Sequence, residues 1–97
     1  MTIAAGSVGP TRLIARMAGL LAADGAPHPL AGALSAAVRG RQQLDLTVFA
    51  AETGLELAVV EAAEAGYVPF DRLPSPIASR IPWLGVDLVA LAADPAA

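Results

Sequence analysis

Two glycines in the middle of the chain, Gly54 and Gly66, divide it into short helix-forming segments. Asp45 is placed to cap a helix over residues 46–53, because its carboxylate can accept hydrogen bonds from backbone N–H groups at a helix start. Gly54 ends this helix, since glycine adopts the left-handed backbone conformation without a steric penalty. For the same reason, a helix over residues 56–65 ends at Gly66. The pattern predicts two short helices joined by a tight turn.

The rest of the chain also favours helices. Its composition is 56% hydrophobic and rich in alanine and leucine, which are strong helix formers, whereas aromatic residues make up only 4%. No alternation of apolar and polar residues lasts long enough to predict a strand. We therefore expect one all-α domain, a small bundle of five or six short helices.

Helix-breaking residues and hydrophobic periodicity divide this bundle into parts. We expect a flexible terminus over residues 1–9, helices that pack on the core over residues 10–38, and a further helical unit over residues 39–93. The first helix carries an apolar stripe that comprises Leu13, Ile14, Met17, Leu20 and Leu21. Gly32 and Gly40 are expected to weaken the next helix.

Prolines limit the helices near the C-terminus. We expect a short helix over residues 77–81, which Pro82 breaks because it lacks a backbone N–H group. A last helix is expected over residues 87–93, closed by Pro95.

The composition excludes several kinds of chemistry. The chain has no cysteine, which excludes disulfides, thiolate catalysis and cysteine-based zinc sites. Its single histidine, His28, lies between two prolines without a carboxylate cluster, which makes a poor metal site. No nucleophile lies near a base, and no glycine-rich phosphate loop occurs. We therefore expect no enzyme activity, no metal, no cofactor and no small-molecule substrate, and we expect Tyr67 and Trp83 to be packing residues.

A mean hydropathy of +0.60 raises the question of a membrane. The longest purely apolar run near the N-terminus covers residues 17–23, whereas a spanning helix needs about 20 apolar residues. The first eleven residues carry no positive side chain, which argues against a signal peptide. We therefore expect a cytoplasmic protein without membrane contact.

The segment over residues 44–55 resembles the first half of the XRE-family helix-turn-helix, the type found in the phage lambda and 434 repressors. The residues that match the family register are Ala50, Gly54, Val60, Glu64 and Gly66. Residues 77–81 and 84–88 look like the family's closing helices. The resemblance covers residues 39–91 and implies a lambda-repressor-like helix-turn-helix within the bundle. The chain departs from the family by an extra N-terminal helix and by the inserted Pro82-Trp83.

In this family, an arginine often pairs with the glutamate that lies two residues before the final glycine of the motif. Arg39 lies at the matching place, so the resemblance implies a partly buried structural ion pair between Arg39 and Glu64. Such a pair adds little net stability because desolvation offsets attraction, but removal of one partner strands the other charge. The alternative is that Arg39 is a solvated surface side chain.

The resemblance implies DNA binding, yet the residues at the reading positions do not support it. Base reading needs hydrogen-bond donors and acceptors, whereas the matching positions hold Leu46, Leu57, Ala58 and Ala62. Residues 44–66 contain no basic residue, and their acidic residues are Asp45, Glu52, Glu56, Glu61 and Glu64. With a net charge of −3 and a pI of about 4.8, the chain lacks the basic balance typical of nucleic-acid-binding domains.

We therefore expect a non-catalytic helix-turn-helix regulatory or adaptor module that acts mainly by protein–protein contact. Its interface would comprise Leu46, Leu57, Ala58 and Glu61. The partner would be another protein, or a second copy of the chain in a homodimer. The helix over residues 11–23 offers a further apolar surface, although packing on the core explains its stripe more simply.

The alternative function is a DNA-binding transcriptional regulator of the XRE type. It would hold the DNA backbone through the arginines near the motif, which are Arg39, Arg41 and Arg72. If Arg39 is used internally, two arginines remain, which are few for a specific complex. A third possibility is a domain that assists a larger complex and folds fully only there.

Overall fold

The computed structural model describes residues 9–93, which form six α-helices and two short 3₁₀ helices. In chain order these are α2 (Gly9–Ala23), α3 (Pro29–Arg41), α4 (Leu46–Thr53), α5 (Leu57–Glu64), the 3₁₀ helix η1 (Phe70–Arg72), α6 (Ser75–Ala78), the 3₁₀ helix η2 (Ile81–Leu84) and α7 (Leu88–Ala93). Every regular element of these residues is helical, which confirms the predicted all-α bundle of five or six short helices. Residues 1–8 of the expected flexible terminus, and Pro95, lie outside the described residues.

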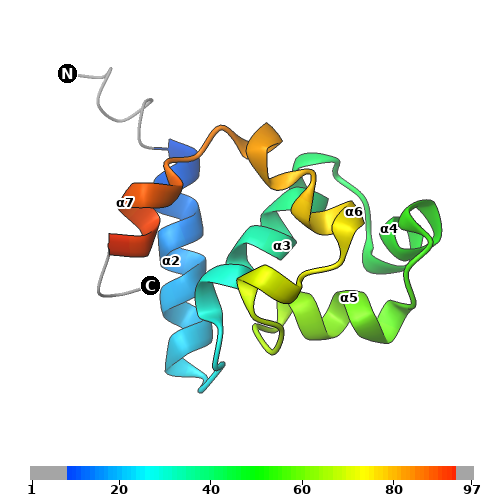
Figure 1. Ribbon diagram of the computed structural model, residues 1–97, viewed down its shortest axis with the longest axis horizontal. Coiled ribbons are helices and arrows are strands. Elements are labelled where there is room, and N and C mark those ends of the chain that lie inside the picture. Colours follow the sequence, from blue (N-terminus) through cyan, green and yellow to red (C-terminus); the bar gives the residue numbers. More distant parts are fainter. Residues whose placement is uncertain (1–8, 94–97) are drawn as a thin grey trace.

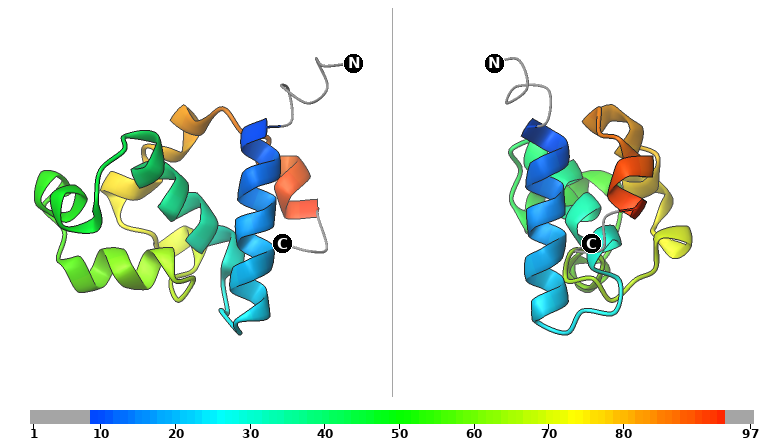
Figure 2. Two further views of the ribbon diagram at one scale, coloured as in Figure 1. Left: turned by 180° about the vertical axis from the view of Figure 1, so that it is seen from behind. Right: turned by 90° about the vertical axis from the view of Figure 1, so that its left-hand side faces the viewer.

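Helix α3 lies at the centre of the molecule and packs against α2, α5, α6 and η2. Helices α2 and α7 lie together at one end of the 42 Å long axis, and α4 lies at the other end (Figure 1). Figure 2 shows the same arrangement from behind and from the side. The boundary expected between residues 38 and 39 falls inside α3. That boundary does not separate two parts of the fold, because α3 contacts the helices on both sides of it.

The core consists mainly of aliphatic side chains from all six α-helices. Its largest fully buried apolar side chains are Phe49, Leu34, Ile77, Leu91 and Val60. Helix α2 joins this core through Ile14 and Ala18, which are 3% and 0% exposed. The apolar stripe expected on α2 is nevertheless divided, because Leu13 and Leu20 are 60% and 71% exposed. The helix packs on the core with one side and exposes a second apolar row.

The start of α3 approaches the chain after α5 so closely that both backbones need a glycine. A Cβ atom added to Gly32 would lie 2.8 Å from the Cα and N atoms of Gly66. Gly66 has a φ of 84°, a left-handed conformation that other residues rarely adopt. Its carbonyl accepts a hydrogen bond of 2.8 Å from the backbone N–H of His28. Gly32 therefore does more than weaken its helix, because it lets α3 touch this turn.

The C-terminal part differs from the prediction at Pro82. The expected helix over residues 77–81 is replaced by α6, which ends at Ala78, and by η2, whose second residue is Pro82. Proline is tolerated there, because N–H groups in the first turn of a helix have no partner within it. Pro82 thus lies in the first turn of a helix instead of breaking one. Asp87 precedes α7 and accepts a 3.0 Å hydrogen bond from the Ala90 N–H.

The prediction that Tyr67 and Trp83 are packing residues is wrong. They are 62% and 58% exposed, and neither belongs to the core. The Arg80 guanidinium lies over the Trp83 ring at 5.7 Å from its centroid. A cation at this distance from an indole is attracted by the ring electrons, so Trp83 contacts Arg80 at the surface.

Candidate functional site on helices α4 and α5

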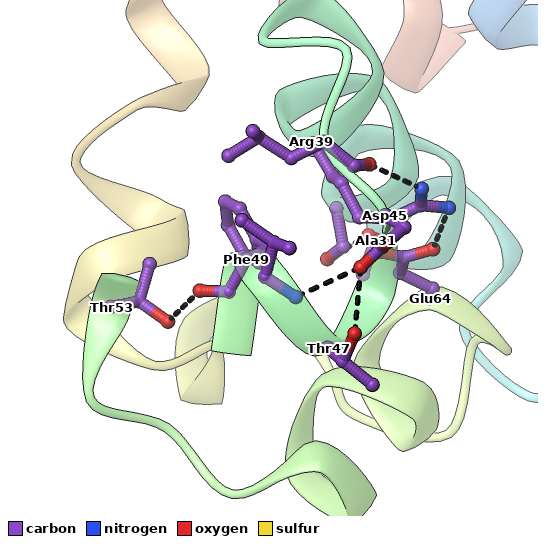
Figure 3. A network of polar contacts seen from close by, with 10 residues as sticks. Ala31, Arg39, Asp45, Thr47, Phe49, Thr53 and Glu64 are labelled. Carbon is purple, nitrogen blue, oxygen red and sulfur yellow. Dashed lines mark hydrogen bonds and ion pairs between the residues drawn. The ribbon is translucent and has the colours of Figure 1, made fainter. Parts of the chain in front are cut away.

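Helix α4 has the start and the end that the sequence predicts. The Asp45 carboxylate accepts hydrogen bonds of 2.9 Å from the Val48 N–H and 2.8 Å from the Thr47 hydroxyl (Figure 3). Gly54 follows the last turn with a φ of 73°, in the left-handed region. The Val48 N–H and then the Thr47 hydroxyl lower the pKa of Asp45 below its ordinary value. Both ends of α4 are therefore set by local contacts.

We expect the contribution of Asp45 to stability to depend on pH. Its pKa is lower in the folded chain than in the unfolded chain, so this contribution is present above the unfolded pKa of about 3.9. It is lost as the pH falls through the folded pKa. The matched variant is Asp45→Asn, which keeps a good capping residue without a charge. Urea unfolding at pH 7 should show the parent as more stable than the variant, and this difference should disappear at a pH below the folded pKa of Asp45. A difference that is the same at pH 7 and at that acidic pH would contradict this expectation.

Arg39, in the last turn of α3, binds the carboxylate of Glu64 at the end of α5. Its Nε and Nη2 donate to Oε2 and Oε1 at 2.7 and 2.9 Å, and its Nη1 donates to the Leu44 carbonyl oxygen at 2.9 Å (Figure 3). The Arg39 and Glu64 side chains are 26% and 12% exposed. The hydrogen bond to Glu64 raises the pKa of Arg39, although desolvation opposes it. Arg39 therefore ties α3 to α5 and to the segment that precedes α4.

The outward side of α4 and α5 carries three of the four residues expected at an interface. Leu57 is 38% exposed, and Ala58 and Glu61 are exposed as well. Leu46 is instead half-buried and packs against the core. It lies in the first turn of α4, on the side of the helix that carries the buried residues. Leu46 therefore contributes less to this surface than expected.

Two further apolar residues on this pair of helices were missed by the sequence reasoning. Val48 and Val59 are 40% and 38% exposed. Each directly precedes a buried residue, Phe49 in α4 and Val60 in α5. Neighbouring residues are about 100° apart around a helix. A residue directly before a buried one therefore lies at the edge of the buried side, where its side chain is partly exposed. Helical spacing from the buried residues was the signal that could have found them.

Acidic side chains accompany these apolar residues. The exposed carboxylates of this segment belong to Asp45, Glu52, Glu56 and Glu61, and residues 44–66 contain no basic residue. Glu56 stands at the N-cap position of α5 without a side-chain capping bond. A carboxylate there offsets the positive end of the helix dipole. The exposed residues of α4 and α5 are therefore mainly apolar or acidic, and we call them together the α4–α5 surface. Leu57 and Val59 lie on opposite flanks of α5 within this surface, because residues two apart are about 200° apart around a helix.

The arginines expected to meet DNA differ in their availability. Arg39 is engaged by Glu64 and by the Leu44 carbonyl. Arg41, at the end of α3, and Arg72, in η1, are exposed. Of the three residues, two are thus open to solvent, and both lie outside α4 and α5.

No group of three or more His, Cys, Asp or Glu side chains in residues 9–93 could hold a metal ion. Over the same stretch, the helices fall short of the length and apolarity needed to cross a membrane. No family model, curated protein or solved structure matches the chain. A functional proposal therefore depends on the chemistry of the α4–α5 surface.

Proposed function

We propose that the chain is a non-catalytic regulatory or adaptor module of the helix-turn-helix type, which acts by protein–protein contact through the α4–α5 surface. The observation that carries this proposal is the charge of residues 44–66, which include acidic residues and no basic one. Affinity for DNA comes largely from positive groups that replace the counterions of phosphates. Exposed carboxylates at these positions would instead repel the phosphate backbone.

The apolar residues of the surface suit a protein partner. Val48, Leu57 and Val59 each have about two fifths of their surface exposed, at 40%, 38% and 38%. Protein interfaces combine apolar side chains, which lose their water on binding, with a polar rim that sets orientation and specificity. A complementary partner would present an apolar anchor flanked by arginine or lysine side chains.

We expect Leu57→Asp to weaken binding of the partner by about tenfold or more, because it places a charge at an apolar contact. The partner is first captured from lysate with the parent chain and identified, and its affinity is then measured by titration calorimetry. Val89→Asp is the matched control, since Val89 is 80% exposed on α7 at the other end of the molecule (Figure 1). Equal affinity of the parent and Leu57→Asp would contradict the assignment of the surface.

The alternative function is DNA binding in the manner of an XRE-type regulator. The order of α4, the turn at Gly54 and α5 supports it, together with the exposed Arg41 and Arg72, which precede and follow these helices in the chain. It requires these two arginines to outweigh the acidic residues of the α4–α5 surface. We favour the protein partner, because the positions that read bases in the family's docking geometry hold apolar residues here, and the exposed charges of this segment are acidic.

A further inference from the structure

The side of α2 that faces away from the core carries a second apolar surface. Leu13 and Leu20 are 60% and 71% exposed, and Met17 between them is half-buried. Together with Pro10, these residues follow one another at spacings of three, four and three along the chain. This is the spacing of a seam along which two helices pack side by side. The row therefore suits contact with another helix.

A groove lies beside this row, at the junction of α2 and α3. One part has a volume of about 360 Å³ and the other about 280 Å³, and Met17 and Ala36 line both parts. On α3, the groove is lined by small residues, Ala36, Ala37 and Gly40. A Cβ atom added to Gly40 would meet nothing within 4 Å. Leucine side chains from a second helix can therefore enter the groove.

The two ends of the groove carry opposite charges. Arg41 lines the end near Pro10, whereas Asp24 lines the other end together with Glu64, whose charge is balanced by Arg39. A helix has a partial positive charge at its N-terminus and a partial negative charge at its C-terminus. These charges favour an incoming helix with its N-terminus near Asp24 and its C-terminus near Arg41. Because α2 runs from Pro10 toward Asp24, the incoming helix would be antiparallel to α2.

We propose that this groove is occupied by α2 of a second copy of the chain, in a two-fold symmetric dimer. The exposed leucines and the groove lie on the same surface, as an interface between identical patches requires. The antiparallel direction is the one that a two-fold axis perpendicular to α2 produces. In that arrangement Arg12, in the first turn of α2, comes near Asp24 of the other copy, which adds an attraction between opposite charges.

The dimer is independent of the proposed function. Helix α4 lies at the end of the molecule opposite α2 (Figure 1), so the dimer leaves α4 and the start of α5 free. Each dimer would present two α4–α5 surfaces to partners. Association of the purified chain with itself requires no other protein. If the purified chain does not associate, the dimer is overturned and the proposed function still stands.

The test is sedimentation velocity of the full chain from low micromolar concentrations to about 1 mM. We expect the parent to shift from monomer to dimer as its concentration rises. Leu13→Asp/Leu20→Asp should raise the dissociation constant by about a hundredfold or more, because a dimer buries four of these side chains. Val48→Asp should dimerise like the parent, since Val48 is 40% exposed on α4, which lies at the end of the molecule opposite α2 (Figure 1). Circular dichroism checks that every variant keeps its helices.

A second variant tests the groove without changing the leucine row. In Gly40→Arg, a long side chain would fill the groove, so this variant should remain monomeric. Arginine is a good helix former and a positive charge suits the last turn of α3, so the fold should be at least as stable as that of the parent. A parent that is monomeric at every concentration overturns the proposal. A dimer that survives both Leu13→Asp/Leu20→Asp and Gly40→Arg also overturns it.

The orientation of the two copies can be tested with single cysteines, because the chain has none of its own. A disulfide requires two Cα atoms within about 7 Å of each other. In the antiparallel dimer, position 13 of one copy lies near position 20 of the other. A mixture of Leu13→Cys and Leu20→Cys, treated with a mild oxidant, should therefore cross-link between the two variants. Cross-linking of each variant only with itself would indicate parallel helices and overturn this arrangement.

Discussion

Replacing Arg39 with methionine is expected to lower the free energy of unfolding by about 2–4 kcal/mol. This is close to the loss observed when one partner of a buried ion pair is removed. The loss comes from the groups that remain. The Glu64 carboxylate is only 12% exposed and would have no positive partner, and the Leu44 carbonyl would lose its guanidinium donor. A domain of this size has a total stability of roughly 5–15 kcal/mol, so the effect would be large.

The matched control for Arg39→Met is the double variant Arg39→Met/Glu64→Leu. Replacing both charges with apolar side chains of similar size leaves no stranded carboxylate, so most of the lost stability should return, to within about 1 kcal/mol of the parent. Urea unfolding of the parent and both variants at one low protein concentration provides the comparison. If Arg39→Met were as stable as the parent, the ion pair would have no structural role.

Replacing Gly32 with alanine is the other substitution with a large expected effect. The added methyl group would lie 2.8 Å from the Gly66 backbone and 2.9 Å from Cδ1 of Leu21. The leucine can turn away, but the backbone at Gly66 is held by its hydrogen bond to His28. Overpacking of this kind costs about 1–3 kcal/mol, and we expect Gly32→Ala to lie at the upper end of that range.

Gly40 offers a control for Gly32 within the same helix. A Cβ atom at Gly40 meets nothing within 4 Å, so Gly40→Ala should gain up to about 0.5 kcal/mol from helix propensity, less than in a helix interior because Gly40 is the last residue but one of α3. Thermal and urea unfolding should therefore move in opposite directions for the two alanine variants. Equal responses at both positions would show that the close approach of α3 to Gly66 does not limit packing.

The parts of the fold that the sequence predicts best depend on contacts between near neighbours. The bounds of α4 are as expected, because Asp45 reaches Val48 and Gly54 ends the helix within its own turn. The contact between Gly32 and Gly66 could not be predicted in this way, because no local pattern shows which distant glycines meet. Pro82 was misplaced for a related reason, since proline both ends helices and begins them.

The same distinction between local contacts and contacts of distant residues applies to the candidate site. The outward positions of Leu57 and Glu61 follow from helical spacing, whereas the meeting of Arg39 with Glu64 was expected only from the family resemblance. The exposure of Leu13 and Leu20 was only the less favoured of two expectations, because an apolar stripe on a helix does not show how much of its width the core will cover. That width depends on how α2 lies against α3, which is a property of the whole fold.

The most direct test of the proposed function is a titration of labelled mixed-sequence duplex DNA with the purified chain. Fluorescence anisotropy is measured at about 50 mM salt, where non-specific electrostatic binding is strong. Because the α4–α5 surface is acidic, the proposal predicts no change in anisotropy up to tens of micromolar protein. Binding that weakens steeply as salt rises, with a smaller salt dependence in Arg41→Ala/Arg72→Ala, would contradict the proposal and identify a DNA-binding regulator.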